Sequence, residues 1–346
     1  MKLEPFGYHL PPELVAQHPC DPRDESRMMV VRRKTGDIEY RIFHDLPEFM
    51  RKDDVLVIND TKVIPAKLIG KKATGGMIEI LLLRRMPADS KLLETWEVLL
   101  RPAKRVRAGT RILFDEECEA QVIACVSEKR WVVAFATNLR FDNFLNKYGK
   151  TPLPPYIKRN KENADSLADV DRYQTIYARL PGSVAAPTAG LHFSQNILNT
   201  LQKKGARVAP ITLHVGYGTF LPIKTDNIED HVMMEEFFEI TPDAAEMVNT
   251  AGRVIAVGTT STRVLESAAD EAGKVKPSSA YTRLFIYPGH RFKRVDSLIT
   301  NFHLPRSSLY LLVCAFAGKP LIEKAYKEAI ADRFRFYSYG DCMLIL

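Results

Sequence analysis

The sequence predicts an α/β protein whose central sheet domain is interrupted by a small inserted antiparallel β-barrel. Two patterns carry this prediction. From residue 207 to the end, short apolar runs alternate with stretches of helix length, which is typical of a sheet covered by helices. Between residues 67 and 149, short runs of alternating polarity are separated by turn residues, which is typical of a barrel. We therefore expect residues 1–66 and 150–346 to form one discontinuous α/β domain around a barrel of residues 67–149.

The first strands are expected before residue 60. Apolar runs at 28–33 and 38–43 flank the turn sequence KTGD at 34–37, which predicts a hairpin. The run DVLVIN at 54–59 is short and apolar, which indicates a buried strand. Both features assign the N-terminal segment to the sheet domain.

The barrel is predicted from five short runs with turn residues between them. These runs lie at 77–83, 95–100, 111–114, 120–126 and 130–136. The segment is also rich in Lys and Arg, most densely in RPAKRVR at 101–107. A small barrel with a basic face would suit RNA, although a cluster of like charges is more often a solvated edge or turn.

The second half of the chain supplies the remaining elements. Ser194 is a candidate N-cap for a helix that continues through Ile197, Leu198 and Leu201 and stops at Gly205. Further strands are predicted at 207–215, 253–257, 284–287 and 342–346. Further helices are predicted at 242–250 (after a cap at Thr241), 263–272, 307–318 and 320–331.

Composition narrows the class of protein. With 346 residues, 46% of them hydrophobic and 26% charged, the chain has the balance of a soluble globular enzyme. Its first residues do not resemble a signal peptide, and no apolar run is long enough for a bilayer. The five cysteines form no C-x-x-C pair, which argues against a zinc site and favours the reducing cytoplasm. The net charge of +7 would favour a polyanionic partner.

The segment GSVAAPTAGLHF at 182–193 is rich in small residues. Small residues let a ligand approach the backbone closely, and this segment leads into a predicted helix N-terminus, which favours anions. Thr188, Gly190 and His192 are therefore candidate substrate-binding residues. A tight turn that packs a helix on the sheet would explain the same composition.

The segment GTTS at 258–261 follows a predicted strand and opens a helix. Thr259 and Thr260 could bind an anion there, or they could simply cap the helix. The segment matches neither a P-loop nor a GxGxxG motif.

The segment TLHVGYGTF at 212–220 carries a strand into a glycine-rich turn. His214 would lie near the end of the strand, where open α/β sheets bind ligands, with Gly216 and Gly218 allowing close approach. A lone histidine is nevertheless more often structural than catalytic.

Three further segments hold groups that could move or orient a proton. On a helix, His231 and Glu235 would share one face. Asn301 and His303 precede a predicted helix, and Asp341 lies in a predicted tight turn. The histidines lack a third ligand at a recognisable spacing, so no metal site is predicted.

Eight segments occur in an order that points to a single family. They are NDTKVIPAKL (59–68), PLPPYI (152–157), YQTIYA (173–178), GSVAAPTAGLHF (182–193), TLHVGYGTF (212–220), AVGTTSTRVLE (256–266), TNFHLP (300–305) and SYGDCML (338–344). Together they resemble the S-adenosylmethionine:tRNA ribosyltransferase-isomerases of the queuosine pathway. The resemblance extends over nearly the full chain.

The resemblance implies a reaction and its partners. The ribosyl part of S-adenosylmethionine would be transferred to 7-aminomethyl-7-deazaguanine in the wobble position of a tRNA. The product would be epoxyqueuosine, with adenine and methionine released. S-adenosylmethionine would thus be consumed as a co-substrate, and no cofactor or metal is expected. The implied fold is an α/β domain with an inserted barrel, and we expect a monomer.

The implied chemistry suggests roles for the candidate residues. A base must deprotonate the carbon beside the sulfonium, and an acid near the purine would help adenine leave. The proton-transfer candidates are His214, His303 and His231, with Asp341 as an orienting acid. The candidates for binding the donor are Thr188, Gly190, Thr259, Thr260 and Arg263, the last of them through the donor's carboxylate. The remaining candidates for substrate binding are His192, Gly216, Gly218 and Asn301.

One position departs from the family pattern. Family members usually read H-x-M-H-x-E where this chain has His231-Val232-Met233-Met234-Glu235-Glu236. Met234 thus replaces the usual second histidine, which favours a pocket-shaping role for the segment. Two other functions stay open from the residues alone: an S-adenosylmethionine-dependent tRNA methyltransferase and a non-catalytic RNA-binding protein. The released product would distinguish all three.

Overall fold

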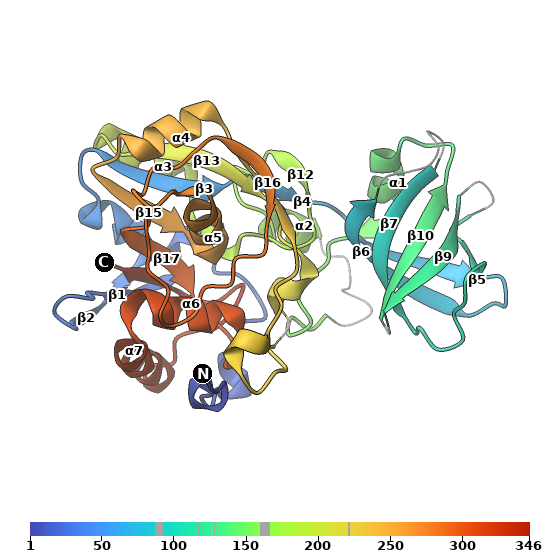
Figure 1. Cartoon of the computed structure of the whole chain (residues 1–346), viewed down its shortest axis with the longest axis horizontal. Coiled ribbons are helices and arrows are strands. Elements are labelled where there is room, and N and C mark those ends of the chain that lie inside the picture. The colour runs from blue at the N-terminus through green and yellow to red at the C-terminus, as the bar shows by residue number, and fades with distance from the viewer. Residues whose placement is uncertain (87–92, 116–117, 128, 160–166, 221) are drawn as a thin grey trace.

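Two β-sheets organise the chain, and they stand side by side in Figure 1. The computed structural model describes residues 1–86, 93–115, 118–127, 129–159, 167–220 and 222–346. One sheet has nine strands and carries the helices, and the other has seven strands and curls into a barrel. The predicted fold class, an α/β sheet with an inserted antiparallel barrel, is confirmed.

The nine-stranded sheet has a parallel centre with further strands on either side. Its parallel centre consists of β13 (Arg207–Leu213), β3 (Asp54–Asn59), β15 (Arg253–Val257) and β17 (Ser297–Asn301), in that order. Beyond β17 lie β18 (Cys342–Ile345), β1 (Arg27–Val31) and β2 (Ile38–Ile42). Beyond β13 lie β14 (Glu236–Ile240) and β16 (Ser278–Thr282). The strands beyond the centre pair antiparallel except for β18 with β1.

Both faces of this sheet are covered, which explains why β3 is apolar from Val55 to Ile58. Val55 and Val57 belong to the core on one face, and Leu56 and Ile58 belong to the core on the other. The first face packs against α4 (Pro242–Asn249), α5 (Gly258–Ala268), α6 (Ser308–Ala317) and α7 (Lys319–Ala331). The second face packs against α3 (Gln195–Lys203) and the 3₁₀-helix η4 (Phe43–Phe49).

The barrel is one continuous antiparallel sheet that closes on itself. Its strands are β5 (Lys67–Lys72), β6 (Met77–Met86), β7 (Leu93–Arg101), β10 (Arg130–Ala136), β9 (Glu119–Ser127) and β8 (Arg111–Leu113), in spatial order. Pairing of β8 with β5 closes the barrel. α1 (Phe141–Tyr148) buries Phe144 and Leu145 in the barrel core, and β11 (Gly149–Lys150) then pairs with β5.

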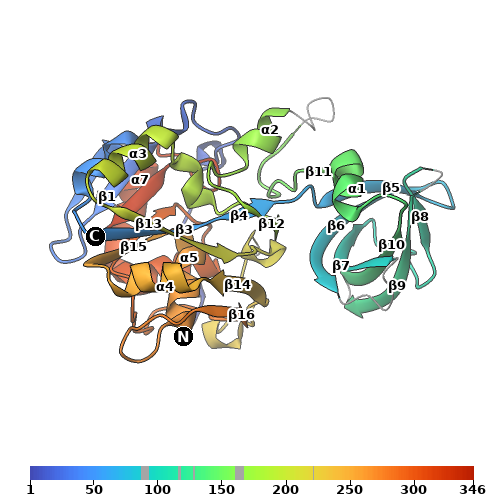
Figure 2. The ribbon, with the colours of Figure 1, turned by 90° about the horizontal axis from the view of Figure 1, so that it is seen from above.

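Short elements complete the fold. The strands β4 (Thr61–Val63) and β12 (Leu180–Ser183) pair in parallel on the side of the sheet domain that faces the barrel (Figure 2). The remaining helices are α2 (Leu167–Arg172) and the 3₁₀-helices η1 (Glu4–Phe6), η2 (Pro12–Leu14), η3 (Arg23–Glu25), η6 (Thr188–His192), η7 (Tyr217–Phe220) and η8 (Ile228–Asp230). Within the described part of the chain, no helix has the length and apolar character needed to cross a bilayer.

Two helix caps are as predicted. Ser194 Oγ accepts a hydrogen bond from the Ile197 N–H at 3.3 Å, and Thr241 Oγ1 accepts one from the Ala244 N–H at 3.2 Å. Each cap satisfies one of the amides that a helix leaves free at its first turn. α3 and α4 therefore begin where the sequence predicted.

Two predicted elements are wrong. The helix expected at 263–272 begins at Gly258 and ends at Ala268, because the small-residue segment before it is itself helical. The strand expected at 284–287 is absent, and β16 lies just before it. There the Leu284 N–H donates to the Thr282 side chain at 3.0 Å instead of continuing the pairing.

Candidate active site

A narrow hollow lies at the ends of β15 and β17, the edge of a parallel sheet where ligands usually bind. The volume of this hollow is about 50 Å³. The predicted site residues that line it are Thr188, Thr259, Thr260, Asn301 and His303. They come from three separate segments, which the sheet brings together.

Two polar atoms at this hollow lack a partner. Thr260 and Asn301 are 7% and 2% exposed, and Thr260 Oγ1 and Asn301 Oδ1 have no hydrogen-bond partner among the described residues. Buried polar groups normally pair, so an unpaired one requires an explanation such as a missing ligand or water. The hollow thus offers a free hydroxyl and a free carbonyl oxygen.

His303 lies in the wall of the hollow as a neutral imidazole. Its Nε2 is 2.7 Å from Thr300 Oγ1, and its backbone N–H donates to the Tyr326 hydroxyl at 2.9 Å. Burial lowers the pKa of His303 to about 3, because a charged ring would lose its hydration there. At neutral pH this ring is uncharged.

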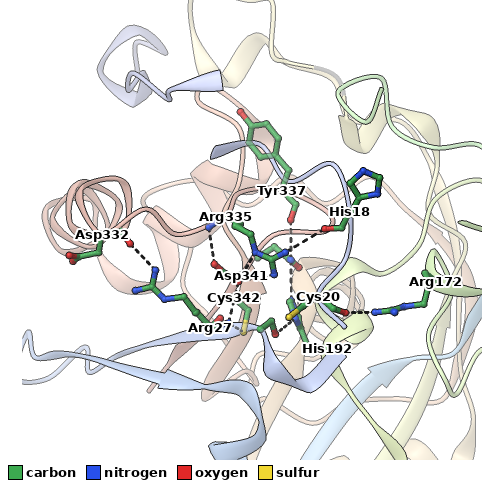
Figure 3. A network of polar contacts seen from close by, with 12 residues as sticks. His18, Cys20, Arg27, Arg172, His192, Asp332, Arg335, Tyr337, Asp341 and Cys342 are labelled. Carbon is green, nitrogen blue, oxygen red and sulfur yellow. Dashed lines mark hydrogen bonds and ion pairs between the residues drawn. The ribbon is translucent and has the colours of Figure 1, made fainter. Parts of the chain in front are cut away.

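His192 lies behind the hollow and not in its wall. Its Nδ1 is 2.7 Å from Ser26 Oγ, and its Nε2 is 3.2 Å from Asn301 Nδ2. Burial, together with the nearby Arg335 and Arg23, lowers the pKa of His192 to about 3. Figure 3 shows His192 within a buried polar network that also includes Tyr337 and Arg335.

These two histidines should make the fold sensitive to acid. Each has a pKa of about 3 in the folded protein and about 6.5 when unfolded, so below pH 6.5 the unfolded chain binds protons that the folded chain does not. The stability that the two neutral histidines contribute is therefore fully present above pH 6.5 and is lost as the pH falls towards 3. At pH 5 each histidine should lower the free energy of unfolding by about 2 kcal/mol relative to its value above pH 6.5.

Urea unfolding at pH 7 and pH 5 measures this loss. His192→Gln removes one of the two titrating groups, so this variant should lose about 2 kcal/mol less than the wild type over the same pH interval. Equal losses in the two proteins would contradict the assignment of the effect to His192.

A second and larger cavity lies between the barrel and the sheet domain. This interdomain cleft has a volume of about 700 Å³, which is in the range of small-molecule sites. The barrel lines it with residues that include Trp96, Arg140 and Phe141, and the sheet domain with residues that include His214 and Gly216. Val215 lines both the cleft and the hollow, so the two cavities adjoin.

His214 is held at the wall of the cleft by its neighbours. Its Nδ1 is 2.8 Å from Thr61 Oγ1, and its ring stacks on Phe237 at 5.7 Å between centroids. A Cβ on Gly182, where φ is +152°, would lie 2.7 Å from His214 Nε2, so only glycine leaves room for the ring. Burial lowers the pKa of His214, opposed by Asp60 and Glu239.

Gly216 is fixed by a buried ion pair. Its N–H donates to Glu236 Oε1 at 2.9 Å, while Glu236 Oε2 accepts from Arg263 Nη1. Both charged side chains are 4% exposed. Arg263 thus has a partner within the protein, and it lies behind the cleft wall that Glu236 helps to form.

The charges around the cleft are mixed. Arg84 and Arg140 come from the barrel, and Glu235 comes from the segment before β14. Glu235 contacts Arg84 Nη1 at 3.7 Å and Arg283 Nη2 at 3.0 Å. The Arg84 contact joins the barrel to the sheet domain beside the cavity.

The segment 231–235 is not a helix, so the predicted shared face of His231 and Glu235 is wrong. After η8 the chain runs without regular structure into β14, and the Glu235 contacts to Arg84 and Arg283 hold it there. The His231 ring meets Phe285 edge-on at 5.1 Å, and partial burial lowers its pKa.

The last candidates have structural contacts. A Cβ on Gly218 would lie 2.7 Å from Met234 Sδ, and one on Gly190 would contact the Tyr177 hydroxyl. Asp341 accepts hydrogen bonds from the Arg335 N–H at 2.8 Å and from its guanidinium at 3.1 Å (Figure 3). Within the described structure, the predicted residues that line neither cavity are Gly190, His192, Gly218, His231, Arg263 and Asp341.

Sequence reasoning did not select several residues of the cavity walls. Tyr156, Tyr337 and Ser338 line the hollow, and the Tyr156 and Ser338 hydroxyls are 2.7 Å apart. These residues stand within or beside the motifs PLPPYI and SYGDCML, which gave the only available signal. Trp96 and Phe141 of the cleft carried no signal, because their position depends on how the barrel meets the sheet domain.

The arrangement defines an α/β protein with two adjoining cavities, one at the sheet edge and one where an inserted barrel meets the sheet. One part is narrow and uncharged, and the other is wide and carries charges of both signs. Among the described residues, no group of three or more His, Cys, Asp and Glu side chains could hold a metal ion.

Comparisons with known proteins identify the family. Residues 3–345 match the family model described as queuosine biosynthesis protein. S-adenosylmethionine:tRNA ribosyltransferase-isomerases of Syntrophus aciditrophicus and Geobacter sulfurreducens are 58% and 49% identical, and each match covers 100% of both chains. The crystal structure of S-adenosylmethionine tRNA ribosyltransferase from Thermotoga maritima is 36% identical, with a TM-score of 0.54 over 99% of each chain. The chain belongs to the queuosine biosynthesis protein family.

Proposed function

We infer that this protein is an S-adenosylmethionine:tRNA ribosyltransferase-isomerase. It would transfer and isomerise the ribosyl group of S-adenosylmethionine onto 7-aminomethyl-7-deazaguanine in the tRNA wobble position, releasing adenine and methionine. The full-length match to relatives with that name carries the inference. The two adjoining cavities support it, because the reaction must bring a small donor together with a large nucleic acid.

The wide cleft suits the meeting of the two substrates. Its barrel side contributes Arg84, Arg85 and Arg140 beside Glu94 and Asp142, and the arginines could contact a phosphate backbone. His214 lies on the opposite wall, and its lowered pKa keeps the ring neutral at physiological pH. We propose His214 as the base that removes a proton, either from the carbon beside the sulfonium or from the incoming amine.

The hollow suits one end of the donor. Thr188, Thr259 and Thr260 bring hydroxyl groups to it, and His303 brings a neutral imidazole. We propose His303 as the group nearest the leaving purine. We propose Gly216 as a contact of the substrate in the cleft. For Arg263 and Asp341 we propose supporting roles through Glu236 and Arg335, the partners that each contacts.

The protein is further proposed to act in the cytoplasm as a monomer without a cofactor. All five cysteines are free thiols, as is usual in a reducing compartment. S-adenosylmethionine would be consumed and would not be regenerated on the protein, so it would act as a co-substrate. Sedimentation of the purified protein would test the monomer.

Product analysis tests the activity. The protein is mixed with S-adenosylmethionine and a tRNA that carries 7-aminomethyl-7-deazaguanine, and free adenine is measured. We expect adenine only when the modified tRNA is present; the same tRNA with guanine at the wobble position is the control. S-adenosylhomocysteine in place of adenine would indicate a methyltransferase, and tRNA binding without any product would indicate an RNA-binding protein.

A further inference from the structure

The orientation of the Asn301 side chain is fixed by two neighbours. Its Nδ2 lies 3.1 Å from the Tyr337 carbonyl oxygen and 3.2 Å from His192 Nε2. A carbonyl oxygen can only accept, so the amide atom facing it must be the nitrogen. The second hydrogen of that nitrogen then points to His192, which must present an unprotonated Nε2.

His192 meets this requirement in one tautomer. Because its pKa is about 3, the ring is neutral at physiological pH and carries a single N–H. With Nε2 as acceptor, that hydrogen is on Nδ1 and is donated to Ser26 Oγ, 2.7 Å away. The hydrogen bonds that link Ser26, His192 and Asn301 thus leave Asn301 Oδ1 as the free amide atom at the hollow. It has no partner there among the described residues.

The wall of the hollow selects the uncharged end of the donor. Among the described residues that line it, none is Asp, Glu, Lys or Arg. The methionine end of S-adenosylmethionine carries an ammonium, a carboxylate and a sulfonium, and burying these groups without charged partners would be costly. Adenine is neutral and flat, and the residues that line the hollow include the aromatic Tyr156 and Tyr337.

We propose that the hollow binds the adenine of S-adenosylmethionine and that Asn301 Oδ1 accepts a hydrogen bond from its 6-amino group. Asn301 is then the residue that selects adenine over purines without this group. His192 is a positioning residue, which acts by holding the Asn301 amide in the required orientation. This proposal rests on the proposed function and specifies which part of the donor enters the hollow.

The test compares two donors with the modified tRNA and measures the release of the free purine base from each. One is S-adenosylmethionine, and the other is its analogue whose purine lacks the 6-amino group. A buried carbonyl left unpaired costs about 1–3 kcal/mol, so the wild type should favour S-adenosylmethionine by roughly 5- to 150-fold in kcat/KM. Asn301→Leu, which removes the acceptor, should bring this ratio close to one by slowing the natural donor.

Variants of His192 test the positioning role. His192→Leu removes one of the two acceptors that hold the amide, and the ratio between the donors should fall to an intermediate value. His192→Gln offers a carbonyl oxygen in place of Nε2, and the ratio should recover. The control is Asn249→Leu, because Asn249 at the end of α4 bonds Val275 and lines neither cavity; its ratio should equal that of the wild type.

The outcomes separate this proposal from the proposed function. If the wild type releases no purine from either donor, the proposed function is wrong. If it releases adenine but uses both donors equally, or if Asn301→Leu keeps the preference, the hollow does not read the 6-amino group and the proposal is overturned. If the Asn301 variant does not fold, the wild-type ratio still shows whether the 6-amino group is read, and the His192 variants show whether that reading acts through Asn301.

Discussion

Replacing His214 with alanine is expected to lower kcat by at least two orders of magnitude. The imidazole lies in the cleft wall, and loss of a general base typically costs about 10²- to 10⁴-fold. For Nε2 to accept a proton, Nδ1 must carry the hydrogen that it shares with Thr61 Oγ1, 2.8 Å away. Adenine release under saturating substrates measures the effect.

The pH dependence of the wild type provides a second measure. Burial lowers the pKa of His214, so the ring stays unprotonated to a more acidic pH than a free histidine. The acid limb of kcat/KM should therefore lie below about pH 6.5, the usual value for histidine. A limb at or above that pH would contradict His214 as the titrating base.

Two variants separate catalysis from structural support. Thr61→Val removes the partner of Nδ1 but leaves the ring, so its loss of kcat should be smaller than that of His214→Ala. His44→Ala is the matched control, because this histidine is exposed, pairs with Glu25 and Asp45, and should retain full activity. His214→Ala with kcat close to that of the wild type would exclude His214 as the base.

The sequence predicted those elements that a local pattern marks. β3 is apolar because both of its faces are buried, and α3 is marked by its cap. β5 was missed because KLIGKK is rich in lysine and contains Gly70. A Cβ on Gly70 would lie 2.4 Å from Ile112 Cγ2, so the glycine serves barrel closure, a contact that becomes visible only in three dimensions.

The sequence predicted some of the residues that line the two cavities, but not how they are arranged. Motif position indicated that Thr260 and Asn301 would approach a ligand, and both reach the hollow. Their motifs could not indicate that His192 would lie behind Asn301, because that contact joins residues 109 positions apart. The Arg263–Glu236 pair was hidden for the same reason, since β14 itself was not predicted.

This buried pair should be the most sensitive electrostatic contact of the sheet domain. Arg263 and Glu236 are each 4% exposed, and removing one of them takes from the other its partner of opposite charge in a buried position. Glu236→Gln or Arg263→Met should therefore lower the free energy of unfolding by about 3–5 kcal/mol. Urea unfolding at pH 7 measures both variants. The i,i+4 pair of Lys319 and Glu323 on α7, whose side chains are 32% and 37% exposed, is the control, and Lys319→Met should cost less than about 1 kcal/mol.

The double variant shows whether the cost arises from the unpaired charge. With Arg263→Met and Glu236→Gln together, neither buried charge is present, so the loss should be much smaller than the sum of the two single losses. Additive losses would mean that the two side chains stabilise the fold independently. Glu236 also accepts the Gly216 N–H at 2.9 Å, two residues from His214. The double variant should therefore recover stability without full activity, because the amide introduced at position 236 has no arginine to hold it in place beside the cleft.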